Sequence, residues 1–427
     1  MWFPLRGRNE QYTGDDRMSI KRIIKNNRIL AVIAYRFRSF RNRQGVRGFA
    51  GLPIDGQKIL FYRPNGGYGD NPKAVAEYIH LHYPQYRLIW ASNDQRFFES
   101  VPNYLKPVLF ESKEYFRELA TAGAWVCCST LPYGTVKRNG QLYIQTWHGD
   151  KFLKKIANDA AADVSDYKAR TAGRTFCESE ICDYYVTGCE WFVPIAASAL
   201  DYRGSFLRCG MPRNDCLVNP DAERCAAIRK DLGIAPDVKI LIYAPTFRDY
   251  EKSLDSVGSD IDLVTILNAL EKKHSCKWIC LMRAHTGKHL TLNGGDIADP
   301  RFMDVTSYPD MADLLMVSDM LISDYSSCGA DFAITGRMVL LYQDDIDQYT
   351  SKGRTLYFTR EESPYFTASN MQEALEIIDR VTDEDIRKNS RGILDFYDSF
   401  EAGHAAETVG KVIADALDQI GRQSSEL

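Results

Sequence analysis

From residue 55 onward, short apolar runs rich in β-branched and aromatic residues alternate with segments of helical spacing. Runs of this length are typical of buried strands, and the segments between them are long enough to be helices. In the first half of the chain the pattern predicts strands at Lys58–Arg63, Arg87–Ala91, Val108–Phe110, Trp125–Ser129 and Leu142–Thr146, and helices at Ala74–His82 and Lys113–Ala122. This alternation predicts a mostly parallel sheet with helices on both faces.

The same alternation begins again near Cys216. It predicts strands at Lys239–Tyr243, Trp278–Met282, Met320–Ser323 and Met338–Tyr342, helices at Ala222–Leu232 and Asp262–His274, and a final amphipathic helix at Ala405–Ile420. Two successive sets of similar size predict an α/β fold of two Rossmann-like domains facing a cleft. We expect an N-terminal segment at 1–54, domains at 55–215 and 216–398, and a C-terminal helix at 399–427.

Composition narrows the class of protein. The chain has 427 residues, 45% of them hydrophobic and 26% charged, which is a globular balance and enough for two domains. The formal net charge of -4 gives no support for a nucleic-acid partner. No apolar run approaches the roughly 20 residues that span a bilayer, and no secretory signal is recognisable. We therefore expect a cytoplasmic protein.

The N-terminal segment differs from the rest in its charge. Ten basic residues and no acidic residue lie between Arg17 and Ala50, interleaved with apolar residues at partly helical spacing. One interpretation is an amphipathic segment lying on an anionic membrane surface. The alternative is a helix packed on the body of the protein with a solvated basic face.

In doubly wound sheets, ligands bind at the carboxyl ends of the strands, so polar residues that follow strands are candidates for a site. Trp147-His148-Gly149 follows the strand at Leu142–Thr146. A histidine here has the pKa range of a general base for a hydroxyl group. Lys151, with Lys154 and Lys155, is expected at the start of a helix, where it offers positive charge to phosphate. The alternative is a loop histidine with a structural hydrogen bond.

Two further motifs follow strands of the second domain. Pro245 and Thr246 come after Lys239–Tyr243, where small and hydroxyl residues let backbone N–H groups approach a phosphate. Arg283 and His285 come after Trp278–Met282 and alternate in an extended segment, so both are expected to project the same way. Such cations can neutralise a diphosphate. The alternative for Pro245 and Thr246 is an ordinary turn between a strand and a helix. The alternative for Arg283 and His285 is a salt-bridged surface turn.

A fourth motif, Asp324-Tyr325-Ser326-Ser327, ends the strand at Met320–Ser323 and precedes a helix that contains Asp331. The two serines offer hydroxyls and backbone N–H groups to a phosphate, and the Asp331 carboxylate could hold a polyol or ribose hydroxyl. Simple N-capping by serine is the alternative.

The order of these motifs resembles the CDP-glycerol glycerophosphotransferases, which build teichoic acids and related polyol-phosphate capsules. The resemblance runs from Lys58 to Phe358 and is carried by Asp70-Asn71-Pro72-Lys73-Ala74, Trp147-His148-Gly149, Gly210-Met211-Pro212-Arg213-Asn214-Asp215, Ala244-Pro245-Thr246, Arg283-Ala284-His285, Asp324-Tyr325-Ser326-Ser327, and Asp347 and Tyr349 ahead of Gly353 and Phe358. It implies a glycosyltransferase-B architecture, with an acceptor-side domain at 55–215, a donor-binding domain at 216–398, and a peripheral position on the inner face of the cell membrane.

The resemblance also implies roles for residues. His148 and His285 are expected to be catalytic, with His148 activating the acceptor. The residues expected to bind the donor are Gly149, Lys151, Arg213, Pro245, Thr246, Arg283, Ser326, Ser327 and Asp331. The implied donor is CDP-glycerol or another CDP-polyol, and the implied acceptor is lipid-linked or polymeric. No metal or cofactor is expected, because no Asp-x-Asp motif lies at a convincing strand end.

Two departures from the family pattern affect the substrate. Asp150-Lys151 stands where the family usually has Thr-Pro, and Thr286 replaces the usual Pro after His285. A nucleotide-sugar glycosyltransferase of the same fold and a non-catalytic scaffold of a polymer-assembly complex are the competing hypotheses. The sequence leaves open whether the polyol is glycerol or ribitol and whether the enzyme is a primer or a polymerase. It also leaves open the acceptor linkage and the oligomeric state.

Overall fold

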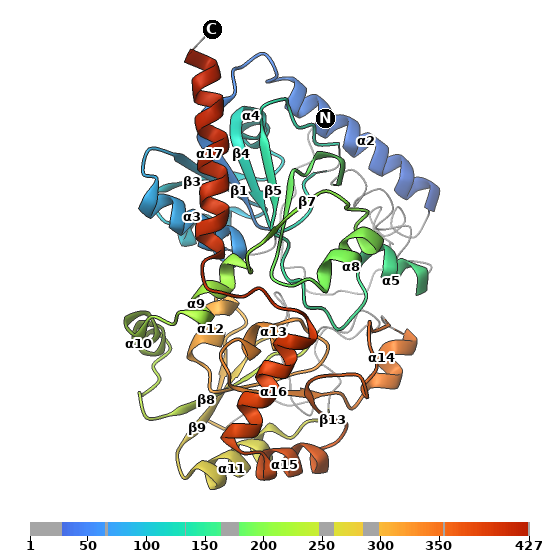
Figure 1. Ribbon diagram of the computed structural model, residues 1–427, viewed down its shortest axis with the longest axis vertical. Coiled ribbons are helices and arrows are strands. Elements are labelled where there is room, and N and C mark those ends of the chain that lie inside the picture. The colour runs from blue at the N-terminus through green and yellow to red at the C-terminus, as the bar shows by residue number, and fades with distance from the viewer. Residues whose placement is uncertain are drawn as a thin grey trace, which may run out of the picture.

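The computed structural model describes residues 28–64, 67–132, 134–163, 179–246, 260–284, 299–352 and 355–425. Two α/β domains lie one above the other along the long axis of the molecule (Figure 1). Each is built on one parallel sheet. Parts of the sequence predictions lie outside the described residues, among them His285, Thr286 and the first 27 residues. The structure therefore does not test what the sequence predicts for them.

The N-terminal domain contains a seven-stranded sheet in the order β3-β2-β1-β4-β5-β6-β7. Its strands are β1 (Asp55–Tyr62), β2 (Arg87–Ser92), β3 (Leu105–Leu109), β4 (Ala122–Cys127), β5 (Leu142–Gln145), β6 (Tyr184–Thr187) and β7 (Ser205–Arg208). Its helices are α2 (Arg28–Arg47), α3 (Asp70–His82), α4 (Lys113–Thr121), α5 (Ala157–Asp163) and α8 (Phe192–Ala199). Strand order reverses between β1 and β4, which marks a topological switch point.

The alternation of side chains along β1 explains the two helical layers. Ile59 and Phe61 point into one core, together with residues of α3 and of α17 (Ala405–Ser425). Leu60 and Tyr62 point into the other, with residues of α2 and α4. Because successive side chains of a strand face opposite sides, a run that is apolar throughout must be covered on both faces.

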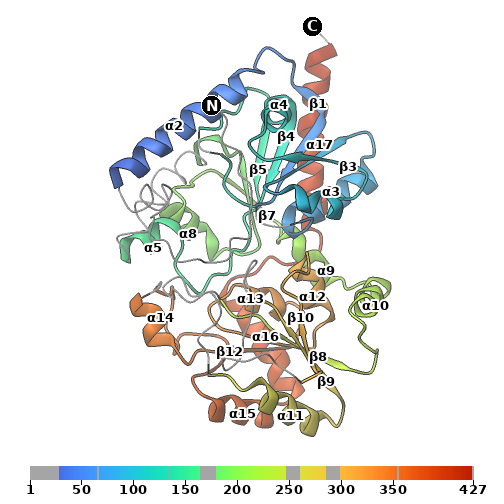
Figure 2. The ribbon, with the colours of Figure 1, turned by 180° about the vertical axis from the view of Figure 1, so that it is seen from behind.

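Helix α17 belongs to the upper domain although it follows the lower domain in sequence. It runs beside α3 and β1 in both views, while α2 lies across the domain from it (Figures 1 and 2). Val409, Ile413 and Leu417 recur at helical spacing and are almost fully buried in the core beneath α3. The chain therefore crosses between the domains twice.

The C-terminal domain holds a six-stranded sheet in the order β10-β9-β8-β11-β12-β13. Its strands are β8 (Lys239–Tyr243), β9 (Trp278–Met282), β10 (Phe302–Asp304), β11 (Met320–Ser323), β12 (Met338–Tyr342) and β13 (Phe366–Ala368). Its helices are α9 (Asp215–Val218), α10 (Ala222–Asp231), α11 (Leu263–His274), α12 (Met311–Val317), α13 (Cys328–Ala333), α14 (Ile346–Lys352), α15 (Met371–Arg380) and α16 (Asp383–Phe396). Strand order reverses between β8 and β11, which is a second switch point.

The predicted fold class is confirmed, since both domains have parallel sheets covered by helices. Four predicted strands of the second domain have the observed bounds. One local prediction is wrong: Lys151–Lys155 does not begin a helix. Lys154 instead pairs in antiparallel fashion with Leu356 of the other domain, and α5 begins later. Within the described ranges, no helix is long and apolar enough to cross a bilayer.

Candidate active site

The sequence motifs gather at the carboxyl ends of the two sheets, where the domains meet. Trp147-His148-Gly149 follows β5 in the upper domain. In the lower domain, Pro245 and Thr246 follow β8, and Ser326 and Ser327 follow β11. Since β8 and β11 flank the switch point, their ends form the crevice where doubly wound sheets bind ligands.

His148 is held by its own strand-end neighbourhood. Its Nδ1 lies 2.9 Å from the carbonyl oxygen of Cys128, which can only accept, so Nδ1 carries the proton. The other ring nitrogen, Nε2, is then a proton acceptor. Trp147 stacks on the imidazole, with ring centroids 4.5 Å apart, and limits its rotation. The tautomer and orientation are those of a general base.

His148 is exposed, while Cys128 contacts its ring and the charges of Asp70 and Arg213 lie nearby. Desolvation by the surrounding protein lowers the pKa of His148 below 6.5, helped by the nearby positive charge of Arg213. The hydrogen bond to Cys128 and the carboxylate of Asp70 act in the opposite direction. His148 is therefore neutral at physiological pH and able to accept a proton.

Strained backbone shapes the loop that carries His148. Trp147 has φ 50° and Gly149 has φ 146°, both outside the usual range of L-residues. The buried side chain of Asn71 holds this loop by donating hydrogen bonds to the carbonyl oxygens of Thr146 and Trp147, at 3.3 and 3.0 Å. The first turn of α3 thus fixes the loop from the side.

Gly149 lies at a close contact between the two domains. A Cβ atom at this position would lie 2.8 Å from Oγ of Ser327 and 3.5 Å from a guanidinium nitrogen of Arg213. The structure therefore brings three of the expected site residues together. It also explains why a glycine stands here, because a side chain would press on Ser327 at a φ that favours glycine.

Arg213 joins both walls of the cleft. Its guanidinium contacts Asp70 of α3 at 2.9 Å and Asp331 of α13 at 2.7 Å, while its backbone N–H donates to Asn71. Asn214 donates a second hydrogen bond to Asp331. The buried Asp331 carboxylate is thus occupied by protein partners, and we assign it to holding Arg213 rather than to a polyol or ribose hydroxyl.

The lower wall consists of short polar segments around the second switch point. The backbone N–H of Thr246 donates to both oxygens of Asp324, at 2.8 and 3.0 Å, which ties the end of β8 to the end of β11. Ser326 and Ser327 follow directly and are partly exposed. Pro245 is buried. These are the residues that the sequence assigned to phosphates and nucleotide.

Arg283 lies at the end of β9 and holds a neighbouring loop. Its guanidinium donates to the carbonyl oxygens of Val305, at 2.6 Å, and of Tyr308. Burial and the positive charge of Arg63 lower the pKa of Arg283 to about 10, so it stays protonated at neutral pH. Arg63, at the end of β1, reaches across to the carbonyl oxygen of Pro309 at 3.4 Å. Two cations from opposite domains therefore lie near each other at the cleft.

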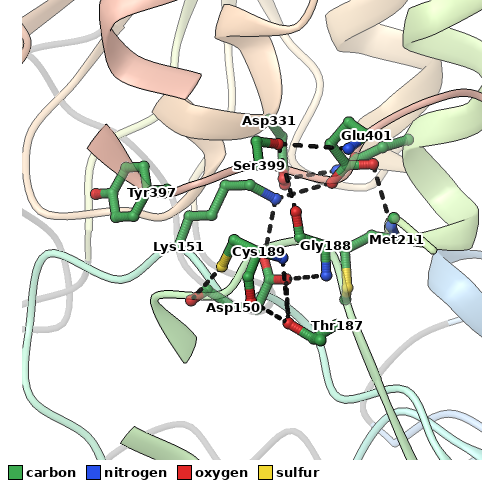
Figure 3. Close-up of polar contacts among 12 residues, drawn as sticks. Asp150, Lys151, Thr187, Gly188, Cys189, Met211, Asp331, Tyr397, Ser399 and Glu401 are labelled. Carbon is green, nitrogen blue, oxygen red and sulfur yellow. Dashed lines mark hydrogen bonds and ion pairs between the residues drawn. The ribbon is translucent and has the colours of Figure 1, made fainter. Parts of the chain in front are cut away.

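Lys151 is not where the sequence placed it. Its side chain has no exposed surface, and its ammonium contacts Glu401 at 2.8 Å and Asp150 at 3.2 Å (Figure 3). Glu401 also accepts from Asn214 and from the backbone of Met211. We therefore assign Lys151 to the connection between the domains and not to the donor phosphates, since buried ammonium groups require such partners.

A second charged connection lies beside the first. Lys73 of α3 contacts Asp310 at 2.8 Å and Asp313 at 3.5 Å, and Arg224 of α10 also contacts Asp313. Lys73 and Asp310 are buried, so the pair is poorly screened by solvent. Together the two connections fix how the upper and lower walls of the cleft face each other.

Comparison with known proteins identifies the family. Residues 46–415 match the sequence pattern of the CDP-glycerol:poly(glycerophosphate) glycerophosphotransferases. The chain belongs to this family.

Individual relatives agree with that assignment. The teichoic acid poly(glycerol phosphate) polymerase of Bacillus subtilis (strain 168) is 31% identical over 374 residues, covering 84% of this chain and 48% of the relative. The polymerase of the same description from Bacillus spizizenii is 31% identical over 384 residues, covering 86% of this chain and 93% of the relative. The chain thus spans about half the length of the Bacillus subtilis relative and most of the other.

A solved structure of the wall teichoic acid polymerase TagF, soaked with CDPG, superposes with a TM-score of 0.75 at 28% identity. The match covers 94% of this chain and 99% of that chain. The two-domain arrangement of this glycerophosphotransferase-family protein is therefore similar to that of TagF.

Some residues of the site were given no role from the sequence, although Asp70 stands in one of the family motifs. Asp70 has φ 63° and accepts from Arg213, and its position after Gly69 and ahead of Pro72 is a turn signal. Arg63 follows a strand, which was also a usable signal. Glu401 offered none, because its partners lie up to 250 residues away along the chain.

Proposed function

We propose that this protein transfers glycerol phosphate from CDP-glycerol to a hydroxyl group of a teichoic-acid-like or capsular polymer. The observation that supports the proposal is that His148, whose Nδ1 is held by Cys128, stands next to Gly149. A Cβ atom at Gly149 would lie 2.8 Å from Oγ of Ser327 and 3.5 Å from Arg213, two residues expected to bind the donor. The family and the likeness to TagF supply the substrate class.

In the proposed step, Nε2 of His148 takes the proton of the acceptor hydroxyl. The hydroxyl oxygen forms a bond to the β-phosphorus of CDP-glycerol as the bond from that phosphorus to the bridging oxygen breaks. CMP leaves with the electron pair, and a phosphodiester joins the glycerol unit to the acceptor. Phosphoryl transfer depends mainly on positioning and on charge stabilisation.

The charge on the donor has candidate partners on the lower wall. Ser326 and Ser327 offer hydroxyl groups and backbone N–H groups to the phosphates. Arg283 supplies positive charge, and Arg213 is held at the cleft by Asp70 and Asp331. Pro245 and Thr246 are expected to line the nucleotide side. His285 keeps its expected role as a second catalytic cation and lies outside the described residues.

We also infer that the protein works as a peripheral protein on the inner face of the cell membrane, with a lipid-linked acceptor. Helix α2 supports this because three large apolar side chains on it are exposed: Ile33 at 57%, Phe37 at 70% and Phe40 at 61%. Exposed arginines lie beside them, among them Arg36 and Arg43. Apolar and basic side chains exposed together are typical of helices that lie in a membrane interface.

The test is turnover of labelled CDP-glycerol by His148 variants. We expect His148→Ala to lower kcat by about 10²–10⁴-fold, since a general base contributes that much. His404→Ala is the matched control, because His404 is exposed and its Nδ1 also contacts a backbone oxygen, that of Ala402. It should retain wild-type turnover and Tm.

A donor panel completes the test. CDP-glycerol, CDP-ribitol and nucleotide sugars are supplied with the same acceptor, and the released nucleotide is measured. Turnover of a nucleotide sugar without turnover of a CDP-polyol would overturn the proposal. Full activity of His148→Ala would remove the base from the mechanism.

A further inference from the structure

A polar pocket lies at the switch point of the upper sheet, away from the donor motifs. It measures ≈ 230 Å³ and sits between α2 and the carboxyl ends of β1, β2, β3 and β4. The side chains that matter for its chemistry are Arg38, Tyr62, Asn93, Phe110, Ser129 and Thr130. Since β1 and β4 flank the reversal of strand order, this is the position where a doubly wound sheet binds its ligand.

One wall of this pocket is formed by the residues that follow Cys128, which holds the ring of His148. The carbonyl oxygen that accepts from the imidazole belongs to Cys128, and the next two residues, Ser129 and Thr130, line the pocket. Gln145, two residues before Trp147, donates to the carbonyl oxygen of Ser129 and fixes this segment. A molecule in the pocket therefore lies beside the segment that holds Nδ1 of His148.

The opposite wall is the basic helix. Gly134 packs so closely that a Cβ atom there would lie 2.3 Å from the carbonyl oxygen of Ser39, so the loop after β4 rests on α2. Arg38 and Arg41 share the carboxylate of Glu111 at 2.7 and 2.6 Å, which leaves one net positive charge at the rim. The pocket thus opens beside the exposed apolar and basic side chains of α2.

The lining matches a polyol that carries phosphate. Asn93, Ser129 and Thr130 present amide and hydroxyl groups, which pair with hydroxyl groups of a ligand. Tyr62 and Phe110 stack with centroids 4.4 Å apart and give a rigid apolar wall for C–H groups. The net positive rim suits a single phosphodiester.

We propose that this pocket is the acceptor subsite, binding the terminal polyol phosphate unit so that its free hydroxyl reaches Nε2 of His148. The inference rests on the proposed function and adds where the acceptor lies. The lower domain already carries the diphosphate and nucleotide motifs around its own switch point, so donor and acceptor occupy equivalent positions in the two sheets. Helix α2 then brings the membrane surface and the acceptor to the same side of the site.

The test compares Asn93→Ala and Thr130→Val with Asn103→Ala. Asn103 is the matched control because it is an exposed asparagine of the same domain that lies before β3, at the amino edge of the sheet. The probe is a short-chain alkyl glycerol phosphate acceptor, with CDP-glycerol as donor. We expect each pocket variant to raise the KM for the acceptor about 5–10-fold, the effect of one lost hydrogen bond, with the KM for CDP-glycerol within about twofold of wild type.

The outcomes separate this inference from the function on which it rests. Acceptor KM values of both pocket variants that equal those of wild type and Asn103→Ala would overturn the acceptor subsite, while turnover of CDP-glycerol by wild type would still support the function. Wild-type protein that neither binds nor turns over CDP-glycerol would contradict the proposed function itself. A rise in the KM for CDP-glycerol equal to that for the acceptor would also overturn the subsite, because it would assign the pocket to the donor.

Discussion

At the scale of single residues, the environment of His148 has a consequence for pH. The base works in its neutral form, and burial lowers its pKa below 6.5. A lowered pKa keeps the ring neutral to more acidic pH. We therefore expect the acid limb of kcat/KM, measured between about pH 5 and 8, to report an apparent pKa below 6.5. An acid limb centred above that value would contradict the assignment.

The buried Lys151 makes a prediction about stability. Lys151→Met leaves Asp150 and Glu401 buried without their cation, so the free energy of unfolding should fall by about 3–5 kcal/mol. Glu401→Gln should cost less, because Asp150 still pairs with Lys151. Urea unfolding followed by fluorescence measures both variants.

The control for this prediction is Lys411→Met. Lys411 pairs with Glu407 on the exposed face of α17, where solvent screens the pair, so no measurable change is expected. If Lys151→Met proved as harmless as Lys411→Met, the buried ion pair would have no structural role.

These residues also show which parts of the site a sequence pattern can predict and which it cannot. His148 and Ser327 could be placed in a site because each follows a strand, and strand ends are predictable from the apolar pattern. Lys151 was assigned to phosphate for the same reason. It pairs instead with Glu401, which lies 250 residues further along the chain and meets Lys151 only when the domains are packed together. Nothing in the local sequence pattern signals this pair.

At the scale of elements, α2 reverses the usual arrangement of a surface helix. Its buried positions include Asn42 and Val46, whereas Ile33, Phe37 and Phe40 face solvent. Replacing Phe37 and Phe40 together with Asp should lower partitioning onto phosphatidylglycerol-containing vesicles at least tenfold, because two aromatic side chains lose their apolar burial. Vesicle sedimentation with the full chain measures this.

Leu81→Asp is the matched control, since Leu81 is 75% exposed on α3, on a different side of the domain. Its variant should bind vesicles as wild type does. Equal loss in both variants, or no loss in either, would contradict membrane contact through α2.

Elements were predicted most accurately where they are buried on both faces. Lys239–Tyr243 and Met338–Tyr342 are continuous apolar runs, and their bounds match. The strands β6, β7, β10 and β13 were not predicted, because they are only three or four residues long and most of their side chains are partly exposed or polar. Helix α17 was predicted by its period, but its packing on the upper domain was not.

At the scale of the whole molecule, Gly149 sets how closely the two walls approach. Gly149→Ala would place a Cβ atom 2.8 Å from Oγ of Ser327 at a backbone φ of 146°, which favours glycine, so Ser327 and the loop that carries His148 must shift. We expect kcat/KM for CDP-glycerol to fall at least about 100-fold, because a shift of about 1 Å has that effect on positioned groups. Steady-state kinetics measures the loss, and the Tm should stay within a few degrees.

Gly233→Ala is the control for backbone strain. Gly233 has φ 69°, and a Cβ atom there meets nothing within 4 Å. This variant should lose about 1 kcal/mol of stability and keep full activity. Equal activity of the two variants would show that the close approach at Gly149 is not required.

The double crossing of the chain also bears on how the protein is made. The upper domain is discontinuous, with the lower domain inserted between its sheet and α17. During synthesis, the ribosome releases the complete lower domain while the core beneath α3 still lacks Val409, Ile413 and Leu417. The domain whose translation begins first is therefore the one whose folding is completed last.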